Sequence, residues 1–188
     1  MGALWKFCMA TVATMALPVF GHAATLGGPD YATQYDYREF YIATDNKPFR
    51  VVLLGNPFPN IEAGVVAQRL LPVMQAAKPP PRLTFTYDVP AEPQHPDYRL
   101  MLVSNPANDL GANSVCNGAQ RFQPGRPGHV YLLGVYCRND LALSEVTGWT
   151  GAAAPDDPAM RDLMKSLFSV LFDPSPGLMP QHGASVIH

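Results

Sequence analysis

Hydrolytic chemistry would need a histidine base beside a nucleophile or an orienting carboxylate, and the sequence offers one such combination. His129 opens a predicted strand, and Asp140 and Ser144 follow a short way downstream. A neutral imidazole takes a proton from a hydroxyl or a water when the two groups lie within hydrogen-bond reach. The sequence contains no G-x-S-x-G, H-E-x-x-H or P-loop pattern. An exported hydrolase that uses His129 with Asp140 or Ser144 is therefore an alternative function rather than the leading one.

Metal binding is the second alternative, and it would involve four side chains. His95 and Asp97 stand close together in a proline-rich turn, and His182 and His188 lie near the C-terminus. Imidazole and carboxylate groups are common metal ligands, but two ligands in one turn do not complete a site. The sequence therefore predicts no metal site and no cofactor, and a periplasmic metal-binding protein is kept as the second alternative.

A long segment at 106–128, rich in Asn, Gly and Pro, is the main candidate for binding a partner. It carries Arg121, Phe122 and Arg126, and His129 follows it directly. Guanidinium groups donate hydrogen bonds to carboxylate and phosphate oxygens, so the segment suits an anion or an acidic partner. The alternative is that these residues only solubilise an insertion. We expect a loop here, since long connections of this kind are often functional.

The first 23 residues have the pattern of an export signal. Lys6 precedes an apolar run over residues 7–20, and Gly21-His22-Ala23 places small residues before a cleavage point. The protein is therefore expected in the periplasm or outside the cell, with no stable membrane span once the signal is cleaved. The alternative is an uncleaved N-terminal helix that anchors the protein, because the uncharged stretch continues to Pro29.

Cysteine usage points to the same compartment. Cys8 would leave with the signal, so that the mature chain keeps two cysteines, Cys116 and Cys137. An even number of cysteines in an exported protein favours a disulfide. Closing a loop of this length stabilises the fold by ~3 kcal/mol on the chain-entropy estimate.

Composition excludes several classes of protein. The chain has 188 residues, with 20 Pro, 15 Gly and an apolar share of 47%, which is that of a globular domain. A formal charge of −2 is unlike the basic surface of a nucleic-acid-binding protein. Beyond the N-terminus, no uncharged stretch is long enough to cross a membrane.

Hydrophobic periodicity predicts six strands and two helices that would position these candidate residues. The first two strands are expected to form a hairpin, and Pro72 is expected to kink or shorten the first helix. Asn60 and Asp157 are the expected N-caps of the two helices. The expected strands are 39–44, 49–54, 83–87, 98–103, 129–137 and 141–150, and the expected helices are 61–77 and 158–171.

This order of elements predicts an α+β fold. We expect a two-layer sandwich in which a mostly antiparallel sheet of five or six strands carries two helices on one face. The expected division is a signal peptide at 1–23, an N-terminal arm at 24–38, one domain at 39–173 and a flexible tail at 174–188. The three tyrosines of the arm belong either to a segment draped over the domain or to a contact surface.

The final strand pair, which leads through Gly148-Trp149-Thr150-Gly151 into a helix, resembles small exported α+β proteins of the bacterial envelope, whose function is unknown. The resemblance covers roughly residues 39–173 and carries over no site. Trp149 is either an exposed aromatic that contacts a ligand or a plug at the end of the core. We expect an exported, non-enzymatic protein that binds an envelope protein or a small ligand.

Overall fold

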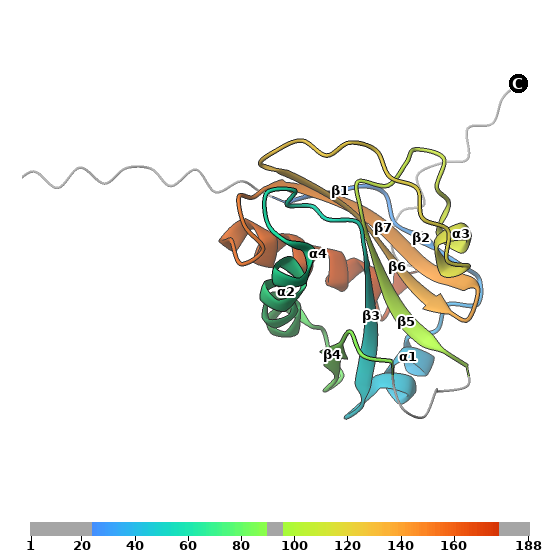
Figure 1. Cartoon of the computed structure of the whole chain (residues 1–188). Coiled ribbons are helices and arrows are strands. Elements are labelled where there is room, and N and C mark those ends of the chain that lie inside the picture. The colour runs from blue at the N-terminus through green and yellow to red at the C-terminus, as the bar shows by residue number, and fades with distance from the viewer. Residues whose placement is uncertain (1–23, 90–95, 177–188) are drawn as a thin grey trace, which may run out of the picture.

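One mixed seven-stranded sheet forms the centre of the protein (Figure 1). The computed structural model describes residues 24–89 and 96–176. The predicted signal at 1–23, His95, His182 and His188 lie outside the described residues. The strands follow the order β1-β7-β6-β5-β3-β4, and β2 pairs with β7 beside β1. The strands are β1 (Thr25–Leu26), β2 (Asp30–Tyr31), β3 (Pro48–Leu54), β4 (Thr84–Thr86), β5 (Tyr98–Ser104), β6 (His129–Arg138) and β7 (Leu141–Gly151).

The predicted α+β class is confirmed, and the sheet is larger and more mixed than expected. β3 pairs in parallel with β4 and β5, and the other described pairings are antiparallel. The segment before residue 39, expected to be an arm, supplies β1 and β2 and so extends the sheet. The helices are α1 (Tyr37–Thr44), α2 (Ala63–Ala77), α3 (Ala112–Cys116) and α4 (Pro158–Leu171).

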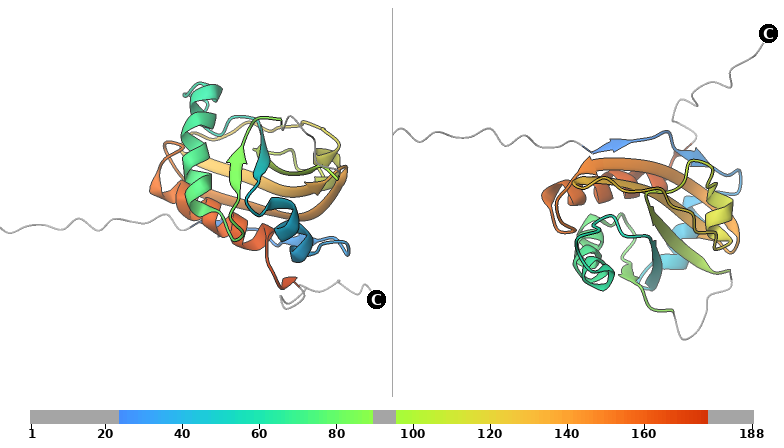
Figure 2. Two further views of the ribbon diagram at one scale, coloured as in Figure 1. Left: turned by 90° about the horizontal axis from the view of Figure 1, so that it is seen from below. Right: turned by 45° about the horizontal axis from the view of Figure 1, so that its top comes forward.

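The two long helices cross and contact each other on one face of the sheet, called the inner face here (Figure 2). Strand alternation buries Phe49 and Val51 of β3 and Leu100 and Leu102 of β5 on this face. α4 approaches β6 and β7 closely because a glycine faces it on each. A Cβ added to Gly134 would lie 2.7 Å from Leu171, and one added to Gly148 would lie 2.8 Å from Leu163.

The short helix α3 lies across the sheet from α2 and α4, on the outer face. It packs on β6 and β7, where Val115 and Cys116 join Leu133, Val135 and Cys137 in a second, smaller core. The segment 106–128 therefore carries a helix of its own, which the sequence prediction of a loop had not anticipated. The start of the segment pairs with residues 121 and 122, since Ala107 N donates to Arg121 O over 3.0 Å and Pro106 bridges to Phe122.

α1 occupies a region predicted to be a strand, so the predicted hairpin at 39–54 is wrong. Asp36 caps this helix by accepting a hydrogen bond from Arg38 N over 2.8 Å. Phe40 and Thr44, one helical turn apart, are both buried. Glu39 ties the helix to the sheet, because its two carboxylate oxygens each accept a 2.9 Å hydrogen bond from Arg138 Nη1.

The two long helices follow the sequence closely, with one difference at a cap. Asp157 caps α4 as predicted and accepts from Ala159 N over 3.0 Å. The N-cap of α2 is Glu62, whose carboxylate accepts from the main chain of Gly64 and Val65, so the predicted cap at Asn60 is wrong. Pro72 does not shorten α2, which continues to Ala77.

Tyrosine hydroxyls fasten the N-terminal segment to the domain. Tyr31 donates a 2.6 Å hydrogen bond to Val170 O, and Tyr35 donates a 2.8 Å bond to Asp173 O. Burial, and then the negative charge of Asp173, raise the pKa of Tyr31 to about 12. The hydroxyl therefore remains a donor at neutral pH, and these tyrosines serve to hold β1 and β2 in place.

Candidate binding site

The residues of the proposed hydrolase do not come together. His129 pairs with Gly151 at one end of the β6–β7 hairpin, whereas Asp140 lies in the turn at the other end. At ~3.3 Å per residue the length of β6 separates them by about 30 Å. Ser144 is buried on the inner face, where its Oγ donates a 2.6 Å hydrogen bond to Leu171 O. The fold therefore does not bring a base together with a nucleophile or a carboxylate among these three residues.

Asp97 is engaged in an ion pair. Its Oδ2 lies 2.5 Å from Arg99 Nη1. Within residues 24–89 and 96–176, no group of three or more His, Cys, Asp or Glu side chains is arranged to hold a metal ion.

The four residues proposed as a binding loop lie at two places. Arg121 is exposed and forms an ion pair with Asp109 over 2.5 Å. Phe122 is 44% exposed, and its main chain bridges to Pro106. Arg126 and His129 are exposed at the end of the segment, where His129 N donates to Arg126 O over 3.0 Å.

Trp149 is 44% exposed and therefore does not plug the core. It lies on the outer face of β7, and its ring centroid is 6.4 Å from that of Tyr131 on the neighbouring strand. Together with Phe122, these aromatic rings place exposed apolar surface on the same side of the sheet as the segment 106–128.

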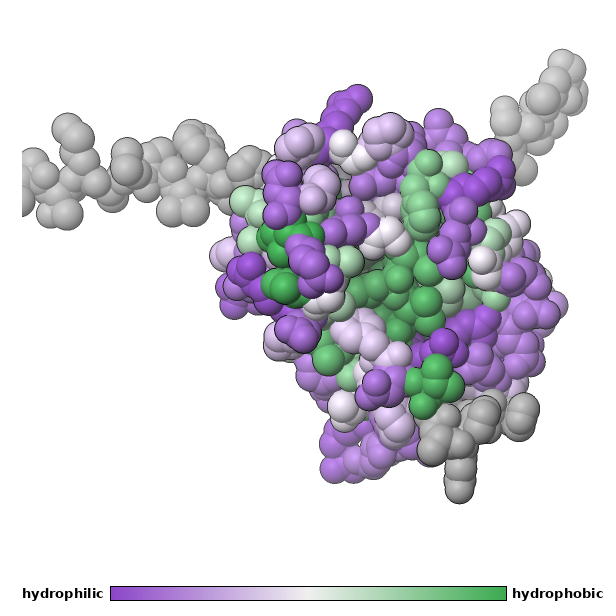
Figure 3. All heavy atoms as spheres, viewed as in Figure 1, coloured by the Kyte–Doolittle hydropathy of each residue, from purple (hydrophilic) through white to green (hydrophobic). Residues whose placement is uncertain are grey.

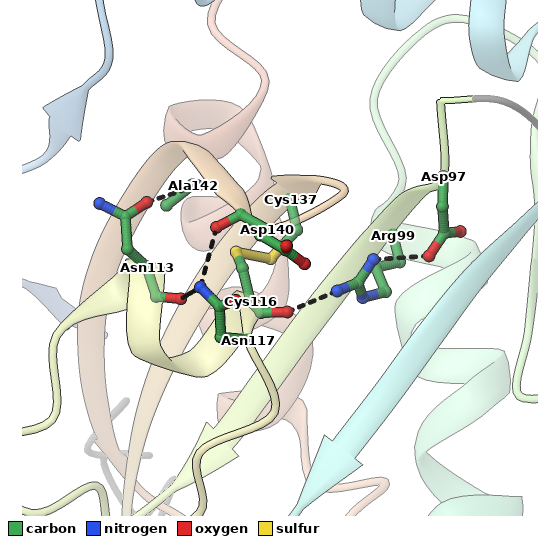
Figure 4. Close-up of a disulfide and its surroundings, with 8 residues drawn as sticks. All are labelled: Asp97, Arg99, Asn113, Cys116, Asn117, Cys137, Asp140 and Ala142. Atoms are coloured by element: carbon green, nitrogen blue, oxygen red, sulfur yellow. Dashed lines mark hydrogen bonds and ion pairs between the residues drawn. A yellow bond between two sulfur atoms is a disulfide. The ribbon is translucent and has the colours of Figure 1, made fainter.

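The predicted disulfide between Cys116 and Cys137 is present and joins α3 to β6 (Figure 4). Two amides fix the surrounding chain. Asn113 Oδ1 accepts from Ala142 N over 2.9 Å, and Asn117 Nδ2 donates to Asn113 O over 2.8 Å. The end of α3 is thereby held against the β6–β7 turn and forms a fixed wall beside β5.

A groove of about 510 Å³ lies next to this wall, on the outer face of β3 and β5. α3 covers β6 and β7, while this part of the face carries Val52, Leu54 and Met101 at its floor. Figure 3 shows the resulting apolar area in the middle of the face turned to the viewer. The remaining lining residues are polar or belong to the walls: Arg50, Asp97, Arg99, Cys116, Asn117, Gly118, Gln120, Asn139 and Asp140.

Two arginines stand side by side at one end of the groove. Arg50 of β3 and Arg99 of β5 are register partners in the parallel pair, so both point to the outer face. Arg99 is 13% exposed and donates to the Asp97 carboxylate over 2.5 Å and to Cys116 O over 2.6 Å (Figure 4). Arg50 makes no ion pair or side-chain hydrogen bond with the described residues, and its Nε is buried without a partner there.

Sequence reasoning missed the groove and both arginines. Each arginine lies near the start of a different predicted strand. In the sequence, each is a single charged residue ahead of an apolar run, and nothing links the two. Only the parallel pairing of β3 with β5, across an intervening helix and strand, brings Arg50 beside Arg99. A weak signal was present, since both strands carry an arginine followed by apolar residues at alternate positions, Val52 and Met101 among them.

A second and smaller hollow of about 180 Å³ lies where β3 and β5 end. Leu54 lines both hollows, while the main chain turns away at Gly55 with a φ of 76°. β3 continues into α2 on the inner face, and β5 continues into the segment 106–128 on the outer face. Such a divergence of neighbouring parallel strands is a common location for ligand sites in open sheets.

None of the helices within the described residues is both long enough and apolar enough to span a membrane.

No protein-family model and no curated protein matches the chain. Among solved structures, it is similar to two crystal forms of the PelC dodecamer from Paraburkholderia phytofirmans. The first is a point variant in space group C2, which is 12% identical with a TM-score of 0.37. The match covers 80% of the present chain and 95% of the PelC chain. The other, in space group P6, is 14% identical with a TM-score of 0.37, covering 80% and 96%. A likeness at this level assigns neither a family nor a function.

Proposed function

We propose that this chain is an exported, non-enzymatic protein that binds a small ligand in the groove on the outer face of β3 and β5. The observation that carries the proposal is the groove itself, with its volume of about 510 Å³. Binding sites for small molecules typically measure ~300–1,000 Å³ and combine an apolar lining with a few polar groups. The volume falls in that range, and Val52, Leu54 and Met101 supply an apolar floor among lining residues that are mostly polar.

Rigidity of the walls also supports a binding role. One wall contains Cys116, which the disulfide fixes to β6, and Asn117, which hydrogen bonds within α3. The floor consists of two paired strands of the sheet. A site preformed in this way loses little conformational entropy when a ligand enters, which favours affinity.

The non-enzymatic part of the proposal is supported by the placement of the candidate catalytic groups. His129 and Asp140 lie at opposite ends of β6, and the Ser144 hydroxyl is buried against Leu171 O. Export is supported by the signal-like pattern of residues 1–23 and by the disulfide, since disulfides persist in oxidising compartments. The exposed rings of Phe122 and Trp149 favour a protein partner as a second mode of binding.

A bulky residue on the rim of the groove tests this function. Gln120 is exposed and lines the groove, so Gln120→Trp should obstruct it without disturbing the core. We expect compounds in a small-molecule library to raise the thermal unfolding midpoint of the wild type. Because stabilisation follows ligand affinity, the same compounds should raise the midpoint of Gln120→Trp much less.

Gln68→Trp is the matched control, because Gln68 is an exposed residue of α2 away from the groove. Its response to each compound should equal that of the wild type. The proposed function is wrong if no compound stabilises the wild type, or if compounds stabilise the two tryptophan variants equally.

A further inference from the structure

We propose that the groove selects a small amphipathic anion, whose carboxylate or phosphate group binds at Arg50 and Arg99 and whose apolar body lies on Val52, Leu54 and Met101. This inference rests on the proposed function, since it names the class of ligand for the same groove. A carboxylate and a phosphate monoester share the feature that matters, an anionic group with several oxygen acceptors.

The arginine pair is the first observation that points to an anion. Arg50 and Arg99 are direct neighbours across the β3–β5 pairing, and like charges in that position destabilise a sheet. Asp97 compensates Arg99, while Arg50 has no ion-pair partner among the described residues. A bound anion would offset the remaining repulsion and would accept the hydrogen bonds that the Arg50 guanidinium has to offer.

The buried Nε of Arg50 is the second observation. Nε belongs to a charged donor group, and it has no hydrogen-bond partner within the described residues. A buried donor without a partner costs free energy comparable to a lost hydrogen bond, so proteins seldom retain one without a reason. Because Nε itself is closed to solvent, an anion in the groove would bind the rest of the Arg50 guanidinium, which lines the groove.

The floor of the groove determines the rest of the ligand. Inorganic phosphate alone would use the arginines and leave the apolar floor uncovered, where Val52 is partly exposed and Leu54 and Met101 are 8% and 4% exposed. Covering apolar surface adds ~25 cal/mol for each Å² removed from water. The ligand that uses all of the groove therefore carries its negative charge at one end and an aliphatic or aromatic body at the other.

Two carboxylates also line the groove, and their positions determine how they act on an anion. Asp97 lies within 2.5 Å of Arg99 and is neutralised by it. Asp140 lies on the far wall, in the turn after β6 and two strands away from Arg50. At ~4.8 Å per strand that separation is about 10 Å, so Asp140 weakens anion binding only slightly.

Calorimetric titration with four probes tests the class of ligand. Octanoate and octyl phosphate combine an anion with an apolar chain, octanamide keeps the chain without the charge, and inorganic phosphate keeps the charge without the chain. We expect octanoate, octyl phosphate or both to bind to the wild type at least about tenfold more tightly than octanamide or inorganic phosphate. The comparison of octanoate with octyl phosphate distinguishes a carboxylate from a phosphate ligand.

Arg50→Gln should weaken the binding of the anionic probe about tenfold or more, because it removes a charged donor from the site. Arg161→Gln is the matched control, since it makes the same change of charge at an exposed position of α4.

Asp140→Asn provides a second test of the anion inference, one that keeps both arginines. It should tighten binding about twofold, as expected for two charges about 10 Å apart in water.

The outcomes separate this inference from the proposed function. If octanamide binds as tightly as octanoate, or if Arg50→Gln leaves the affinity unchanged, the groove binds ligands but the anion inference is wrong. If none of the octyl probes binds to the wild type, the inference is also wrong, and the library experiment with Gln120→Trp decides the proposed function independently. If Arg50→Gln does not fold, the octanamide comparison and Asp140→Asn still give the answer.

Discussion

Arginines at the ends of three neighbouring strands have three different environments. Arg138 of β6 faces the inner side, where Glu39 holds it through two 2.9 Å contacts. Arg99 of β5 faces the outer side and is held by Asp97 and by the main chain of Cys116. Arg50 of β3 has the same orientation as Arg99 and no such partner within the described residues. Side-chain environment, rather than residue type, therefore distinguishes a structural arginine from one available to a ligand.

Glu145 is a second residue whose environment determines its behaviour. It lies opposite Asp30 in the β2–β7 pairing and lines a hollow beside α3. Burial, and then the charge of Asp30, raise the pKa of Glu145 above its ordinary value of 4.5. The folded protein therefore holds the proton of Glu145 more tightly than the unfolded chain does. As the pH rises from 4.5 through this raised pKa, the carboxylate increasingly destabilises the fold.

Replacing Glu145 by glutamine should therefore stabilise the protein at neutral pH and have little effect in acid. We expect Glu145→Gln to raise the thermal unfolding midpoint by about 2 °C at pH 7, because the amide carries no charge to desolvate or to repel Asp30. At a pH below 4 the gain should vanish, since Glu145 is then protonated in both states. Calorimetric melts over this pH range measure the difference.

Asp162→Asn is a suitable control, because Asp162 is an exposed residue of α4 and the substitution makes the same change of charge. It should leave the pH dependence of stability unchanged. An equal gain for Glu145→Gln at pH 7 and below pH 4 would show that burial and Asp30 do not destabilise the Glu145 carboxylate.

Among the secondary-structure elements, α1 illustrates how local signals compete. Its residues are aromatic and β-branched, which favours a strand on periodicity alone. Asp36 followed three residues later by Glu39 is a helix-start pattern that the strand prediction overlooked. Packing decides the outcome, since Phe40 stacks on Phe172 with ring centroids 4.3 Å apart and is fully buried. Tertiary contacts of this kind override a weak local preference.

α3 depends on the disulfide in a way that can be measured. The helix has five residues, fewer than a helix needs to be stable by itself, and it is held by Cys116 and by packing on β6 and β7. The bridge spans a sequence separation of 21 residues. We expect the double variant Cys116→Ala/Cys137→Ala to lose ~3 kcal/mol of unfolding free energy in urea titrations, mainly because the unfolded chain becomes less restricted.

The single variant Cys116→Ala provides the control, because it breaks the same bridge and should lose a similar amount. Reduction of the wild type should have the same effect as the substitutions. A double variant as stable as the oxidised wild type would contradict this account, as would two freely alkylated thiols in folded, exported protein.

For the whole molecule, the arrangement of layers determines where a ligand can bind. α1, α2 and α4 cover the inner face, and α3 covers only β6 and β7 on the outer face. The groove over β3 and β5 is one part of the outer face that this arrangement leaves open to solvent. Its position follows from the order of strands and from the short length of α3.

The proposed export concerns the whole chain and leads to its own prediction. When the full sequence is expressed in a bacterium, we expect the mature protein to begin at Ala24, because Gly21-His22-Ala23 matches the end of a cleaved signal. Cell fractionation followed by intact-mass measurement tests this directly. A periplasmic product with the mass of residues 24–188 is expected. A full-length product retained in the membrane would instead favour the uncleaved anchor.

The sequence alone was sufficient to predict those elements whose signals are local. The α+β class, the hairpin of β6 and β7 and the helix α4 all follow from periodicity and from caps such as Asp157, and these are short-range effects. The Cys116–Cys137 disulfide was predictable because only two cysteines remain after the expected signal.

Tertiary structure alone decided which surfaces can act. It placed His129 and Asp140 at opposite ends of β6, and it brought Arg50 beside Arg99. The physical reason is that strand order and parallel pairing depend on which faces pack together, which no short stretch of sequence specifies. The elements are therefore largely local properties of this chain, whereas its candidate binding site is a property of the assembled sheet.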